Sequence, residues 1–178
     1  MTDDYFFDTD CLSAFLWVNG ESILEKLYPQ RIILPSQVYD ELNRVPFLVN
    51  RVNIMLANDT AKIESMIADT DEYMDYVKMI SSPDDGHKII GRGEAAGIAM
   101  VKARGGILAS NNLRDISDYV EEFNIAHITT GDILVEAYDQ DVITEDEGNQ
   151  LWMEMISKRR MLPTDTFSDY LKYKKDDV

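Results

Sequence analysis

The sequence predicts an α/β protein with a central parallel β-sheet of four to five strands, flanked by helices in three layers. Two observations indicate this fold. Short apolar runs alternate with stretches of helical periodicity, and the runs are apolar throughout, which is typical of strands buried on both faces. No linker or internal repeat divides the 178 residues, so we expect a single domain over 1–178 with right-handed crossovers.

In the first half of the chain, apolar runs indicate strands, and apolar residues recurring every three to four positions indicate helices. Leu12, Phe15 and Leu16, for example, share one face of the first helix. The Asn19-Gly20 pair ends that helix, and prolines mark later breaks. The expected elements are a strand at 5–7, helices over 10–18 and 22–27, a strand at 31–34, a helix that begins at 35–36 and includes 39–42, a helix over 47–58, a strand or extended link at 61–67, and a helix over 69–80.

The second half continues this alternation after a loop at 81–86. Its best-defined helix is rich in alanine and ends at Gly105-Gly106. Thr130 is expected to cap one helix, and Thr144 opens a capping box with Glu147. The expected elements are helix 94–104, strand 107–109, helix 115–123, strand 126–128, a helix from 130 to 138, a long helix from 144 to about 160, and a weak helix over 167–173.

The charge of the chain limits the partners that it attracts. It has 33 acidic and 17 basic residues, a formal net charge of −16, whereas nucleic-acid-binding proteins usually present a basic surface. Either the acidic residues lie away from a nucleic-acid substrate, or the ligand is not a long nucleic acid. Part of the excess is local and forms either a solubilising surface or a face for a basic partner protein: Asp69, Asp71, Glu72 and Asp75, then Asp139, Asp141, Glu145, Asp146 and Glu147.

Cysteine use and hydropathy bear on the compartment. Cys11 is the single cysteine, so no intramolecular disulfide can form, which favours a reducing, cytoplasmic setting. The N-terminus, Met1-Thr2-Asp3-Asp4, is acidic and therefore does not resemble a signal peptide. No apolar run approaches the ~18–20 residues that a membrane span needs, so we expect no membrane partner.

Acidic and amide residues recur where the expected strands end or in the helices behind them. Because the carboxyl ends of parallel strands meet at one edge of a sheet, we expect these side chains to gather in one crevice. The set is Asp8 after the first strand, Glu41 after the second, Glu94 at the start of the alanine-rich helix, and Asn112 and Asp115 after strand 107–109. Gathered carboxylates repel one another, and a hard divalent cation neutralises them. Each residue singly also has a structural explanation, as a helix cap, a turn residue or a surface acid.

The order of these residues resembles that of PIN-domain proteins, a family of metal-dependent ribonucleases that includes many bacterial toxins of toxin–antitoxin pairs. Each motif is short, and four in the right order carry the likeness, which spans about Tyr5 to Tyr138. The matching segments are Phe7-Asp8-Thr9-Asp10-Cys11-Leu12, Leu34-Pro35-Ser36-Gln37-Val38-Tyr39-Asp40-Glu41-Leu42, Gly93-Glu94-Ala95-Ala96-Gly97-Ile98-Ala99 and Leu108-Ala109-Ser110-Asn111-Asn112-Leu113-Arg114-Asp115-Ile116. A later segment, Thr129-Thr130-Gly131-Asp132-Ile133-Leu134, resembles one in PIN-like bacterial proteins.

The resemblance implies a site for Mg²⁺ or Mn²⁺. The implied catalytic residues are Asp8, Glu41, Glu94 and Asp115, and the implied metal ligands are Asp8, Glu94 and Asp115. The residues expected to orient water or phosphate are Ser110, Asn112, Arg92 and Arg114. The chain departs from the family pattern in carrying Asn112 in place of an aspartate, in extra helices near 46–80, and in a C-terminal helical extension over 144–178. The two arginines have a second interpretation, as counter-charges for the acids.

Three functions follow as hypotheses. The first is a metal-dependent endoribonuclease that hydrolyses phosphodiester bonds in RNA, as the toxin of a toxin–antitoxin pair, with a basic antitoxin-like protein partner and a homodimeric form as further expectations. The alternative is a catalytically weak PIN-like module that binds protein or nucleic acid. A phosphoacceptor α/β domain ranks third, because the strand ends lack the lysine that such a domain carries.

Overall fold

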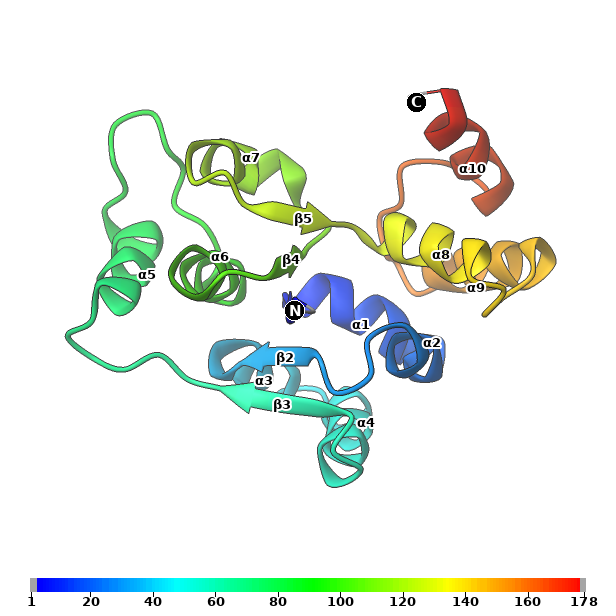
Figure 1. Cartoon of the computed structure of the whole chain (residues 1–178), viewed down its shortest axis with the longest axis horizontal. Helices are drawn as coiled ribbons and strands as arrows, with labels where there is room; N and C mark the ends of the chain where they lie inside the picture. The colour runs from blue at the N-terminus through cyan, green and yellow to red at the C-terminus, as the bar shows by residue number, and fades with distance from the viewer. Residues whose placement is uncertain (1–2, 177–178) are drawn as a thin grey trace.

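The computed structural model describes residues 3–176, which form the predicted parallel sheet (Figure 1). Its five strands are β1 (Tyr5–Phe7), β2 (Ile32–Pro35), β3 (Ala61–Glu64), β4 (Ile107–Ala109) and β5 (Ala126–Ile128), in the spatial order β3-β2-β1-β4-β5. The outermost positions of the predicted domain, 1–2 and 177–178, lie outside the described residues.

Helices cover both faces of the sheet, which confirms the predicted three layers. The apolar core on one side of the sheet contains residues of α1 (Thr9–Trp17), α2 (Glu21–Leu27), α3 (Ser36–Leu42), α4 (Pro46–Ala57), α8 (Thr130–Asp139), α9 (Glu145–Ser157) and α10 (Phe167–Asp176). The core on the other side contains residues of α5 (Asp71–Ser81), α6 (Arg92–Arg104) and α7 (Leu113–Glu122). Figure 1 shows α5 and α6 on one side of the sheet and α1, α2 and α8 on the other.

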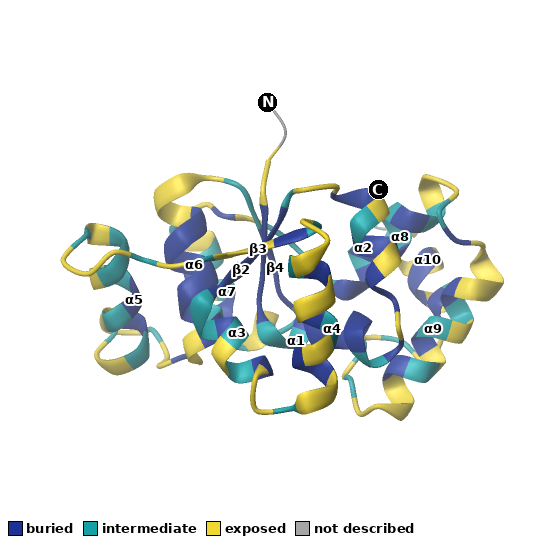
Figure 2. Cartoon of the chain, turned by 90° about the horizontal axis from the view of Figure 1, so that it is seen from below, coloured by how far each residue is buried: buried dark blue, intermediate teal, exposed yellow. Residues whose placement is uncertain are grey.

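The two apolar cores follow from the pleat of the central strand β1. Phe6 is buried in the core beneath α5, α6 and α7, whereas Tyr5 and Phe7 are buried in the opposite core. Successive side chains of a strand point to opposite faces, so a run of three apolar residues supplies both cores. Figure 2 shows the resulting distribution, with buried residues along the sheet and on the inner sides of the helices.

Several element boundaries differ from the sequence-based prediction. Of the stretch at 61–67, only the part to Glu64 is a strand, and it extends the sheet beyond β2. The cap of α8 is Thr129 rather than Thr130, because the Thr129 hydroxyl accepts the N–H of Asp132 at 3.2 Å. Thr130 instead begins the helix and is fully buried. Both threonines are good caps, and the capping-box spacing of Thr129 to Asp132 is the sequence signal that distinguishes them.

The long helix α9 ends at Ser157 rather than near residue 160. Arg159 adopts the left-handed region at φ +61°. The N–H of Arg159 donates to the carbonyl of Ile156 at 2.9 Å, and that of Arg160 donates to Met155 at 3.0 Å. This pair of bonds is a Schellman motif, which ends a helix and turns the chain. It brings Arg160 to the carboxyl edge of the sheet.

The order of the strands creates a switch point between β1 and β4. From β1 the chain adds β2 and β3 on one side, and then returns to add β4 and β5 on the other. Open parallel sheets bind ligands in the crevice outside such a switch point. No helix within 3–176 combines the length and the apolar character needed to cross a membrane.

Candidate metal centre

The residues that follow β1 and β4 meet at the switch point. These strands are parallel neighbours, and the N–H of Asp8 donates to the carbonyl of Ala109 at 2.9 Å. Asp8 and Ser110 therefore leave the sheet side by side, and both are buried, with 1% and 0% of their surface exposed. The predicted crevice begins at this pair.

Asp8 is both a helix cap and a crevice residue. Its Oδ1 accepts the N–H of Cys11 at 2.7 Å and so caps α1, but its Oδ2 is buried without a hydrogen-bond partner among the described residues. The pKa of Asp8 is raised to about 7, mainly by burial and to a smaller extent by the charges of Asp10 and Glu94. The Ser110 hydroxyl and the Cys11 amide oppose this effect, although Ser110 stands outside hydrogen-bond geometry with Oδ2.

Glu41 reaches from α3 to the first turn of α6. Its Oε1 accepts the N–H of Gly93 at 3.2 Å, and its Oε2 accepts the hydroxyl of Thr9. The amino end of a helix stabilises a carboxylate in this position. A Cβ atom at residue 93 would lie 3.0 Å from both Glu41 Oε2 and Thr9 Oγ1. Glycine at this position therefore allows the carboxylate to approach the backbone.

Glu94, Asn112 and Asp115 form a chain of contacts. Glu94 Oε2 accepts the N–H of Gly91 at 3.0 Å, and its Oε1 accepts Nδ2 of Asn112 at 2.6 Å. The same nitrogen donates to Oδ2 of Asp115 at 2.9 Å. This hydrogen bond lowers the pKa of Asp115, and the Lys88 ammonium, 3.5 Å from Oδ1, lowers it further. The amide of Asn112 thus joins two acids whose charges would otherwise repel.

A cavity of about 230 Å³, here called the acidic cavity, is lined by three of the four acids predicted to be catalytic: Asp8, Glu41 and Glu94. The fourth, Asp115, lines an adjoining hollow of about 740 Å³, here called the outer depression. Because Glu94 lines both, the two hollows form one continuous surface at the carboxyl edge of the sheet. Asp115 belongs to its outer part, where Asn112 ties it to Glu94.

The residues predicted to orient the substrate lie in different places. Ser110 is buried at the end of β4, where its Oγ accepts the N–H of Asn112 at 3.4 Å. Arg114 is exposed and lines the outer depression. Arg92 lines neither hollow, because its Nε donates to the hydroxyl of Tyr76 at 3.1 Å.

Arg160 is a site residue that the sequence did not indicate. Its Nη1 donates to Oδ1 of Asp10 at 3.1 Å and to Oγ of Ser13 at 3.2 Å, and it lines both hollows. Arg160 lies 150 positions from Asp10 in a segment expected to be helical, so no local pattern connects them. The available signal is the run of cations Lys158-Arg159-Arg160 in a strongly acidic chain.

The donor set fits a hard divalent cation. Within the part of the chain that the structure describes, no three acidic, histidine or cysteine side chains already converge on one point as a metal site would require. The candidate ligands are nevertheless all oxygen atoms, and Asp8 Oδ2 offers lone pairs that no donor in the described part of the chain uses. Mg²⁺ keeps several water ligands and needs one or two carboxylates from the protein, which Asp8 and Glu94 would supply.

Comparisons with known proteins leave the family open. A search against models of protein families and a search of curated proteins both returned no match to this chain. The resemblance to PIN-domain proteins therefore stays a prediction that rests on the motifs themselves.

Proposed function

We propose that this protein is a metal-dependent endoribonuclease that hydrolyses phosphodiester bonds. The observation that carries the proposal is the buried Oδ2 of Asp8, which has no hydrogen-bond donor among residues 3–176, in a carboxylate that lines one cavity with Glu41 and Glu94. Burying a carboxylate without a partner is costly, and a cation bound beside it removes that cost. The position at the switch point of a parallel sheet supports a ligand site there.

Asp8, Glu94 and Asp115 are the proposed ligands of Mg²⁺ or Mn²⁺. Such a cation supplies a nucleophilic water at neutral pH and stabilises charge on the leaving oxygen. Glu41 faces the same cavity, and two protein donors orient it, which suits it to accept a proton from water. Asn112 holds Glu94 and Asp115 at a constant separation, so their positions do not depend on the cation alone.

The local charge of the outer depression fits an anionic substrate better than the net charge of −16 does. Three arginines, Arg114, Arg159 and Arg160, line this depression together with three acids, Asp10, Glu94 and Asp115, so its formal charge is balanced rather than strongly negative. Guanidinium groups bind phosphate oxygens in a bidentate manner, and both Arg114 and Arg159 are exposed. The acidic excess lies partly elsewhere, as in the first turn of α9. A phosphodiester backbone that follows the depression would reach the acidic cavity at Glu94.

The direct test is cleavage of single-stranded RNA with Mn²⁺ in the reaction. We expect Asp8→Asn to lower the cleavage rate at least about 100-fold, the scale on which a group of this kind acts. The matched control is Asp146→Asn, which removes an exposed acid far from the site. An Asp8→Asn enzyme that cleaves as fast as the control would exclude the proposed chemistry.

A second function, a catalytically weak module that binds protein or nucleic acid, is favoured by a different observation. The other acids of the cavity already have protein donors: Thr9 and Gly93 for Glu41, and Gly91 and Asn112 for Glu94. A structural network of this kind would not need a cation. Calorimetry with Mn²⁺ separates the two functions, because heat of binding that Asp8→Asn abolishes favours the enzyme, and its absence favours the module.

The proposal extends to a toxin with a basic antitoxin-like partner. The net charge of −16 and the exposed acids Glu145, Asp146 and Glu147 support an interaction with a basic protein. Expression of the chain alone should then arrest growth, and co-expression of a small basic protein from the neighbouring gene should relieve the arrest. Growth arrest by Asp8→Asn would argue against toxicity through RNA cleavage. The size of the purified chain in solution tests the expected homodimer.

A further inference from the structure

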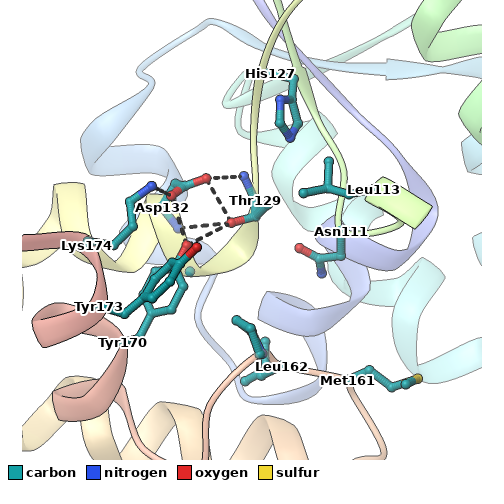
Figure 3. A pocket seen from close by; sticks show the side chains of 12 residues that line it. Asn111, Leu113, His127, Thr129, Asp132, Met161, Leu162, Tyr170, Tyr173 and Lys174 are labelled. Atoms are coloured by element: carbon teal, nitrogen blue, oxygen red, sulfur yellow. Dashed lines mark hydrogen bonds and ion pairs between the residues drawn. The ribbon is translucent and has the colours of Figure 1, made fainter. Parts of the chain in front are cut away.

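A third hollow, here called the aromatic pocket, opens beside the outer depression (Figure 3). Its volume of about 510 Å³ suits a small organic group. Tyr170 and Tyr173 of α10 form one wall, with ring centroids 6.2 Å apart and planes at 33°. Leu113 and Leu162 form an apolar part of the lining. The lining therefore offers flat aromatic and apolar surface on more than one side.

A polar atom without a partner among the described residues lies just behind the lining of the pocket. Nε2 of His127 is buried and has no hydrogen-bond partner among the described residues. Figure 3 shows the imidazole pointing between Thr129 and Leu113 into the pocket. Burial lowers the pKa of His127, so the ring is neutral at pH 7 and Nε2 can serve as a donor or an acceptor. A buried polar atom of this kind gains from a ligand that pairs with it.

The aromatic wall is held in place by hydrogen bonds. The hydroxyl of Tyr170 donates to Oδ1 of Asp132 at 3.0 Å, and Nζ of Lys174 lies 2.8 Å from the same oxygen. Oδ2 of Asp132 accepts the Thr129 hydroxyl at 2.9 Å, and Figure 3 shows this network. The Tyr170 part of the wall is thus ordered before any ligand arrives, which lowers the entropic cost of binding.

The aromatic pocket is continuous with the candidate metal centre. It shares Asn111, Leu113 and Met161 with the outer depression, and the outer depression shares Glu94 and Arg160 with the acidic cavity. A path therefore runs from the carboxylates, past arginines, to an aromatic wall. This order of surfaces matches a nucleotide, whose phosphate is anionic and whose base has apolar faces and a hydrogen-bonding edge.

We propose that the aromatic pocket binds a nucleobase of a single-stranded polynucleotide whose neighbouring phosphate lies at the acidic cavity. The inference rests on the proposed nuclease function and names its substrate class. The exposed ring of Tyr173, which packs against the buried Tyr170, provides the stacking surface, and His127 pairs with the edge of the base. A base in a duplex is already stacked and paired, so the pocket selects unpaired strands.

The experiment measures binding to the full chain in EDTA, so that it does not depend on cleavage. The probes are adenosine 5′-monophosphate, uridine 5′-monophosphate and ribose 5-phosphate, which lacks the base. We expect at least one nucleotide to bind about tenfold more tightly than ribose 5-phosphate, as stacking of one base implies. Ribose 5-phosphate that binds as tightly as both nucleotides would overturn the proposal.

Substitutions in the lining test whether the preference for nucleotides over ribose 5-phosphate arises in the aromatic pocket. Tyr173 is 55% exposed, so Tyr173→Ala should fold, and we expect it to weaken nucleotide binding about tenfold without changing ribose 5-phosphate binding. The control is Phe47→Ala, another exposed aromatic on α4. His127→Phe should weaken nucleotide binding, and His127→Gln, which restores a polar edge, should recover part of it. Unchanged nucleotide affinity in both Tyr173→Ala and His127→Phe refutes the pocket.

The outcomes for the pocket and for the nuclease are separable. Nucleotide binding in EDTA that depends on Tyr173, together with no Asp8-dependent cleavage, would support the nucleobase pocket and exclude the nuclease. Cleavage that depends on Asp8, with no preference for nucleotides over ribose 5-phosphate, would support the nuclease and exclude the nucleobase pocket.

Discussion

Asn112 joins Glu94 and Asp115 through one amide nitrogen, at 2.6 Å from the first carboxylate and 2.9 Å from the second. We expect Asn112→Ala to release both acids, to raise the pKa of Asp115 toward its ordinary value, and to lower Mn²⁺ affinity about 10- to 100-fold, as loss of an orienting partner does. Calorimetry measures the affinity, and carboxyl NMR titration measures the pKa. Asn58→Ala, at an exposed helix end, is the control. Equal Mn²⁺ affinity in the two variants would show that the tether does not support the site.

Asp8 should make the free energy of unfolding of the metal-free protein depend on pH. Its pKa is about 7 in the folded chain and near 3.8 when exposed. Between these values the folded state keeps a proton that the unfolded state has lost, so the free energy of unfolding falls as pH rises from about 4 to about 7, by up to about 4 kcal/mol. Urea unfolding in EDTA at pH 5 and pH 8 measures this change.

Asp8→Asn should remove that contribution, so the comparison of the two proteins isolates it from the other titrating groups. Mn²⁺ should stabilise the native chain more at pH 8 than at pH 5, because the ionised carboxylate binds the cation. Identical pH dependence in the native chain and in Asp8→Asn would show that Asp8 does not carry the effect.

Arg160 contacts Asp10 and lines both the acidic cavity and the outer depression. Its removal should therefore weaken RNA binding and strengthen metal binding. Arg160→Gln should weaken binding of single-stranded RNA in EDTA and reduce the slope of log affinity against log salt by about 0.7, the value for one phosphate contact on a single strand. Mn²⁺ affinity should rise, because a competing positive charge is gone. Lys62→Gln on the edge strand β3 is the control. A salt slope unchanged from the control would place Arg160 outside the path of the RNA.

Alanine variants of Gly93 and Gly97 distinguish the effect of Glu41 position on cleavage from the effect of α6 stability. A Cβ at residue 93 would lie 3.0 Å from Glu41 Oε2, so Gly93→Ala should displace this carboxylate and lower cleavage at least about tenfold. Gly97→Ala on the same helix places its Cβ 2.8 Å from Leu108 in the core. It should lower the free energy of unfolding by about 1–3 kcal/mol, as overpacking does, without lowering the cleavage rate of the folded protein. Equal loss of cleavage in both variants would attribute the effect to the helix.

The sequence predicted a parallel sheet of four to five strands because most strands carry their own apolar signal, whereas the stretch at 61–67 stayed open between a strand and an extended link. A continuous apolar run such as 107–109 is distinctive, and the glycines before it mark the end of a helix. The weaker predictions concern termini, where adjacent residues compete. Thr129 and Thr130 are equally good caps in isolation, but the capping-box spacing of Thr129 to Asp132 is a sequence signal for Thr129, and the burial of Thr130 agrees with it.

The sequence by itself therefore determined that this chain alternates strands and helices and that Asp8 follows the first strand, because these properties depend on neighbouring residues. Tertiary structure decided what gathers around Asp8. Glu41 enters the cavity because Gly93 has no Cβ, and Arg160 arrives through a turn that ends α9. The meeting of His127 and the tyrosines of α10 in one pocket likewise depends on how distant segments pack, and packing between segments far apart in the chain leaves no local pattern in the sequence.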